Sequence, residues 1–68
     1  MKGVVNMFKL FICCQCVLST NKFVDIENSV EFKYWTNSCE LHNAQILLDV
    51  IMNNAIRFGQ MVLTYEVN

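Results

Sequence analysis

The spacing of the apolar residues changes along the chain, and this change limits the folds that the chain can adopt. Apolar and polar residues alternate over residues 22–35 and again over 60–67, which is the period of a β-strand. Over residues 38–58, apolar residues instead recur at the spacing of an amphipathic helix. The pattern therefore predicts an α+β fold in which residues 22–67 have the element order β-β-α-β.

Residues 22–35 are predicted to form a β-hairpin. Val24 and Ile26 would lie on one face of the first strand, and Phe32 on the same face of the second. A loop at residues 27–29 keeps the apolar side chains of both strands together on that face, which fixes the register.

The helix is predicted to run from about residue 38 to residue 58. Asn37 is a residue type that favours the N-cap, and Glu40 three positions later completes a capping-box pattern. Gly59 would supply the left-handed residue that ends the helix. The side predicted to face the core carries Leu41, Ala44, Leu48, Ile51, Ala55 and Phe58.

Two apolar residues of this helix fall on its opposite, polar side. Ile46 and Val50 are four positions apart and are therefore neighbours on the helix surface. The chain has 68 residues, of which 54% are apolar and only 16% charged. A chain of this length buries only about 60% of its unfolded surface, so apolar surface is left over. We expect a protein partner or a second copy of the chain, with Ile46 and Val50 at the interface.

The first nineteen residues have two main interpretations. Lys2 and Lys9 precede an apolar run at residues 10–18, and this order is typical of a secretory signal peptide cleaved after Ser19. The run is too short to span a bilayer, which takes about 20 apolar residues. The interpretation that we favour, together with an intracellular location, is a buried apolar strand or helix of the domain itself.

The cysteines suggest a metal site. Cys13 with Cys16, and Cys39 with His42, form two pairs with the spacing that zinc sites use, and thiolate and imidazole suit tetrahedral zinc. A small zinc-stabilised protein is therefore an alternative function. The flanks lack the Gly or Pro of a zinc knuckle, which favours ordinary structural cysteines. Acylation of Cys13, Cys14 and Cys16 beside the apolar run would attach the chain to a membrane.

The charges and the remaining motifs argue against two other classes of function. The net charge is −1 and the five basic residues are scattered, which disfavours nucleic-acid binding. Cys39 and His42 have the residue types of a nucleophile and its base, but no third orienting group accompanies them. We therefore expect one small non-enzymatic domain over residues 1–68 that acts through protein contacts.

Overall fold

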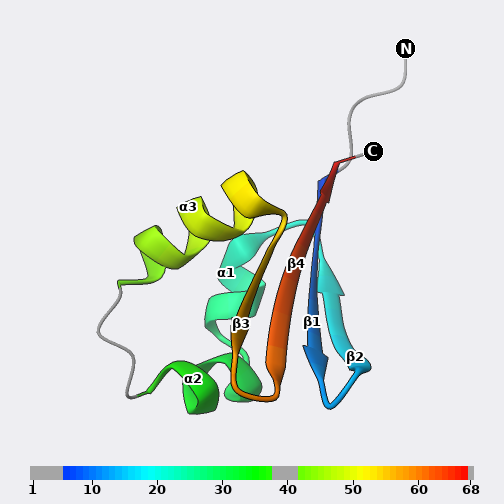
Figure 1. Ribbon diagram of the computed structural model, residues 1–68, viewed down its shortest axis with the longest axis vertical. Helices are drawn as coiled ribbons and strands as arrows, with labels where there is room; N and C mark the ends of the chain where they lie inside the picture. Colours follow the sequence, from blue (N-terminus) through cyan, green and yellow to red (C-terminus); the bar gives the residue numbers. More distant parts are fainter. Residues whose placement is uncertain (1–5, 38–41, 68) are drawn as a thin grey trace.

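The described residues form four strands and three helices. The structure is a computed structural model that describes residues 6–37 and 42–67. In chain order the elements are β1 (Asn6–Ile12), β2 (Gln15–Thr20), α1 (Phe23–Glu27), α2 (Val30–Thr36), α3 (Asn43–Asn53), β3 (Ala55–Phe58) and β4 (Met61–Val67). The strands form one antiparallel sheet in the order β2-β1-β4-β3, and the helices lie against one of its faces (Figure 1). The predicted α+β class and the small single domain are confirmed.

The central strands β1 and β4 supply the sheet side of the core. They pair antiparallel, with Phe8 opposite Tyr65 and Leu10 opposite Leu63. Because side chains alternate across a strand, these residues all lie on the face that the helices cover. Phe8 and Leu10 are buried. Residues 6–19 thus provide β1 and most of β2, so cleavage after Ser19 would remove a central strand.

The prediction of a β-hairpin over residues 22–35 was wrong, because this segment forms the helices α1 and α2. Ile26 and Phe32 are fully buried, whereas Val24 and Val30, which the hairpin would have placed on the same face, are exposed. Alternation over so few residues also fits a helix, since a short segment cannot distinguish a period of 2 from one of 3.6.

Two local features explain why the segment is helical. Ser29 is the N-cap of α2, where its hydroxyl oxygen accepts a hydrogen bond from the backbone N–H of Phe32 at 3.2 Å. Phe23 and Ile26 in α1, like Phe32 and Trp35 in α2, are three residues apart, and all four belong to the core or pack against it. Ser29, which was assigned to the hairpin loop, therefore caps the N-terminus of a helix instead.

The predicted helix over residues 38–58 is shorter in the structure, where α3 spans Asn43–Asn53. It begins after His42, whose backbone N–H donates to the side-chain oxygen of Gln45 at 3.1 Å. It ends at Asn54, which takes the left-handed conformation (φ 67°) that was predicted for Gly59. Asn37 follows the last turn of α2 instead of capping α3, and the predicted partner Glu40 lies outside the described residues.

Residues 55–58, predicted as the end of the helix, form the edge strand β3. Gly59 belongs to the tight turn that joins β3 to β4 and has a φ of +59°. A Cβ atom built at this position would lie 2.6 Å from the Trp35 ring, so the glycine allows α2 to approach the turn. The last strand, Met61–Val67, coincides with the predicted one, and its residues Met61 and Leu63 are fully buried.

The core joins the helix layer to the sheet. Its buried residues are Phe8, Leu10, Ile26, Phe32, Ile46, Val50, Met61 and Leu63. Aromatic rings contribute to the core: the Phe8 centroid lies 5.4 Å from that of Phe23, which joins the sheet to α1, and 4.9 Å from that of Tyr65 on the neighbouring strand. Among the described residues no charged or polar residue is buried, so the core is held by apolar packing.

Candidate functional site

Three of the four residues predicted to bind zinc lie in the described part of the chain, and these three, Cys13, Cys16 and His42, do not form a group that could hold a metal ion. Cys13 lies in the turn between β1 and β2, and Cys16 lies on β2. His42 stands at the start of α3, which Figure 1 places on the far side of the molecule from that turn. Cys39 lies outside the described residues. Residues 6–37 and 42–67 hold no group of three or more His, Cys, Asp or Glu side chains arranged to bind a metal ion.

The turn between β1 and β2 has an unusual backbone. Cys13 and Cys14 are its two residues, and both have positive φ values, of 50° and 69°. This pair of left-handed residues is typical of type I′ hairpin turns, where Asn and Gly are preferred. The backbone N–H of Cys13 donates to the carbonyl of Gln60 at 3.1 Å, which ties this turn to the turn between β3 and β4. Cys13, Cys14 and Cys16 are all exposed free thiols.

Ile46 and Val50, predicted as an exposed contact pair, are fully buried in the core. α3 lies over β3 and β4, and this side of the helix is the one turned to the sheet. The predicted assignment of the two sides is therefore reversed. Leu48, which was expected in the core, is 59% exposed.

The exposed side of α3 carries three large apolar side chains. Leu48, Ile51 and Met52 are 59%, 40% and 78% exposed and follow one another at helical spacing. We call these three residues the α3 stripe. Sequence reasoning found the periodicity of the stripe but placed it in the core. Ile51 and Met52 are separated from Leu48 by three and four positions, so the three side chains form one continuous surface.

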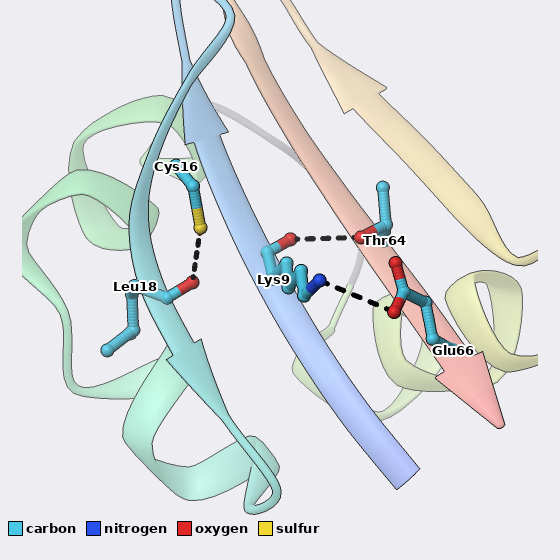
Figure 2. A network of polar contacts seen from close by, with 5 residues as sticks. All are labelled: Lys9, Cys16, Leu18, Thr64 and Glu66. Atoms are coloured by element: carbon cyan, nitrogen blue, oxygen red, sulfur yellow. Dashed lines mark hydrogen bonds and ion pairs between the residues drawn. The ribbon is translucent and has the colours of Figure 1, made fainter. Parts of the chain in front are cut away.

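The sheet has an open face opposite the helices. On this face Lys9 on β1 lies 3.4 Å from Glu66 on β4, measured from Nζ to the carboxylate oxygen (Figure 2). The hydroxyl of Thr64 donates to the backbone carbonyl of Lys9 at 3.5 Å. On β2 the thiol of Cys16 donates to the carbonyl of Leu18, also at 3.5 Å. Such contacts between exposed groups contribute little to stability, about 0–1 kcal/mol for the ion pair.

Phe11 and Val62 lie at the other end of this open face, directly opposite each other on the central strands. Both are only partly buried. Arg57 follows in the same row on the edge strand β3, where it pairs with Val62. One end of the open face thus carries the ion pair of Lys9 and Glu66. The other end carries the apolar Phe11 and Val62 beside the cation of Arg57.

Comparisons with protein families, with characterised proteins and with solved structures find no match for this chain. Within the described part of the chain, none of the helices has the length and the apolar character needed to cross a membrane.

Proposed function

We propose that this chain is a non-enzymatic protein-interaction module that associates with a second copy of itself through the α3 stripe. The observation that carries the proposal is the exposure of Leu48, Ile51 and Met52 on one side of a helix whose other side is already buried. Burying one such side chain contributes roughly 1.5–3 kcal/mol, so three of them supply the apolar centre of a modest interface.

A second copy is the partner that the charges of α3 favour. The helix carries one charged residue, Asp49, which is three positions before Met52 and therefore borders the stripe on one side instead of lying within it. In a two-fold arrangement each stripe would meet its own copy, and no like charges would be brought together at the centre. The low charge content of the whole chain, 16%, supports the same proposal, because a small domain with few charges gains by covering apolar surface.

Sedimentation velocity across a range of protein concentrations tests this proposal. The wild type should sediment faster as its concentration rises. Leu48→Lys combined with Met52→Lys should remain monomeric, because both changes place a charge at the centre of the interface. Circular dichroism should show the same fold for both proteins, since the two residues are exposed.

The matched control adds the same two charges elsewhere on α3. Asn43→Lys and Asn53→Lys change exposed polar residues at the two ends of the helix. This control should associate as the wild type does. A wild type that stays monomeric at every concentration, or a control that dissociates as much as the stripe variant, would contradict the proposal.

A further inference from the structure

The open face of the sheet contains a shallow depression of about 390 Å³ at the end where the two hairpin turns meet. Phe11 and Val62 line it from the central strands, and Arg57 lines it from β3. Cys13 and Cys14 close it at the turn between β1 and β2. Its volume is at the lower end of the range for small-molecule sites, about 300–1,000 Å³.

Arg57 is held in place beside the depression. Its Nε–H donates to the backbone carbonyl of Gly59 at 3.0 Å, which leaves the two terminal nitrogens of the guanidinium for another partner. Among the described residues no carboxylate pairs with Arg57, whereas the other cation of this face, Lys9, is paired with Glu66. The depression therefore has one cationic group whose fork geometry matches a carboxylate.

The other lining residues include the polar Gln60 and Thr64, but Phe11 and Val62 on the central strands favour an apolar ligand body. The Phe11 and Val62 side chains are only partly buried, and they lie on the face of the sheet opposite to the core residues Leu10 and Leu63. A ligand that covered them would remove apolar surface from water, at about 25 cal/mol for each Å². One unpaired cation favours a monoanion over a phosphate dianion, which would need further positive charge.

From these features we propose that the depression binds an aliphatic monocarboxylate, a short to medium-chain fatty acid. Its carboxylate pairs with the guanidinium of Arg57, and its chain lies over Phe11 and Val62 toward Cys13 and Cys14. This proposal is independent of self-association, because α3 lies on the helix side of the sheet (Figure 1), whereas Phe11, Val62 and Arg57 alternate with the core residues and so lie on the other face.

The cysteines provide a local readout. Cys13 and Cys14 line the depression, whereas Cys16 is also exposed but lies outside it, on β2 opposite Phe11. A bound chain should shield the first two thiols from alkylation and leave the third unprotected. Reaction with iodoacetamide, followed by peptide mass spectrometry, gives the rate at each cysteine separately.

The experiment is a titration of the full chain with decanoate at non-micellar concentrations, followed by amide chemical shifts and by the alkylation rates. Saturable shifts at Phe11 and Val62, with slower alkylation of Cys13 and Cys14 alone, are expected. Decanol, which lacks the charge, should bind at least about tenfold more weakly, since a charge-assisted hydrogen bond is lost.

Two variants complete the test. Arg57→Gln should weaken decanoate binding about tenfold and leave decanol binding unchanged. Lys33→Gln, which removes an exposed cation on α2, should change neither. Equal affinity of the wild type for decanoate and decanol, or the absence of saturable shifts with decanoate, would overturn the proposal without reference to any variant.

Discussion

One side of α3 packs against the sheet and the other faces solvent, although both are apolar. Ile46 and Val50 are fully buried, whereas Leu48 and Met52 are 59% and 78% exposed. At 100° per residue the apolar positions occupy most of the circumference of the helix, and only a narrow polar strip remains. The spacing of apolar residues therefore identifies a helix that is apolar on both sides, but it does not decide which side packs against the core. The position of the sheet decides it.

The largest effect should come from removing two strands of the sheet, β1 and most of β2. A fragment of residues 20–68, the product of cleavage after Ser19, lacks β1 and with it the core residues Phe8 and Leu10. We expect it to be unfolded, with no cooperative transition in circular dichroism, because the core would lose two of its eight buried residues and the sheet a central strand. A folded fragment that begins at Thr20 and is recovered from a secreted fraction would instead support the signal-peptide hypothesis.

A smaller effect is expected where the helix layer meets the turn between β3 and β4. Gly59→Ala places a Cβ atom 2.6 Å from the Trp35 ring and requires alanine at a φ of +59°. The free energy of unfolding should fall by about 1–3 kcal/mol, measured by denaturant unfolding. An unchanged midpoint would mean that α2 does not pack against this turn.

The turn between β1 and β2 and the turn between β3 and β4 both contain residues with positive φ values, but of different types. Gly59 takes a positive φ without strain, whereas Cys13 and Cys14 both do so with a Cβ atom. Replacing them with Asn and Gly, the residues that type I′ turns prefer, should raise the free energy of unfolding by about 0.5–1 kcal/mol. A loss of stability in this double variant would show that the cysteine side chains make contacts on which the fold depends.

The smallest effect is expected from chelation. The core is apolar, and Cys13, Cys16 and His42 are not brought together. A chelator should therefore leave the melting temperature unchanged. Because Cys39 lies outside the described residues, this measurement decides the zinc hypothesis. One equivalent of zinc in the purified protein, with unfolding on its removal, would establish the zinc-stabilised alternative.

Residue patterns predicted the class of the fold, the presence of the long helix and the last strand, Met61–Val67. These features rest on long or strictly alternating patterns. Residues 22–35 were assigned to strands because Val24 and Ile26 alternate with acidic residues over too few positions to exclude a helix. Ser29 was the signal that could have corrected this, since Ser is a preferred N-cap and not only a turn residue.

The candidate site was predicted less well, for a physical reason. The stripe of Leu48, Ile51 and Met52 was recognised as apolar, but burial depends on where other elements pack. The depression beside Arg57 joins residues from three strands and two turns that are far apart in the sequence. Such a site follows from strand order, β2-β1-β4-β3, which local patterns do not contain.

The most direct test of the account compares two alanine substitutions that are two positions apart in α3, on opposite sides of the helix. Ile46→Ala should lower the free energy of unfolding by about 2–5 kcal/mol, because it leaves a cavity in the core. Leu48→Ala should change it by no more than about 0.5 kcal/mol under dilute, monomeric conditions, because that side chain is exposed. Denaturant unfolding of both variants beside the wild type gives the two values. A large loss for Leu48→Ala with little change for Ile46→Ala would contradict the assignment of the two sides.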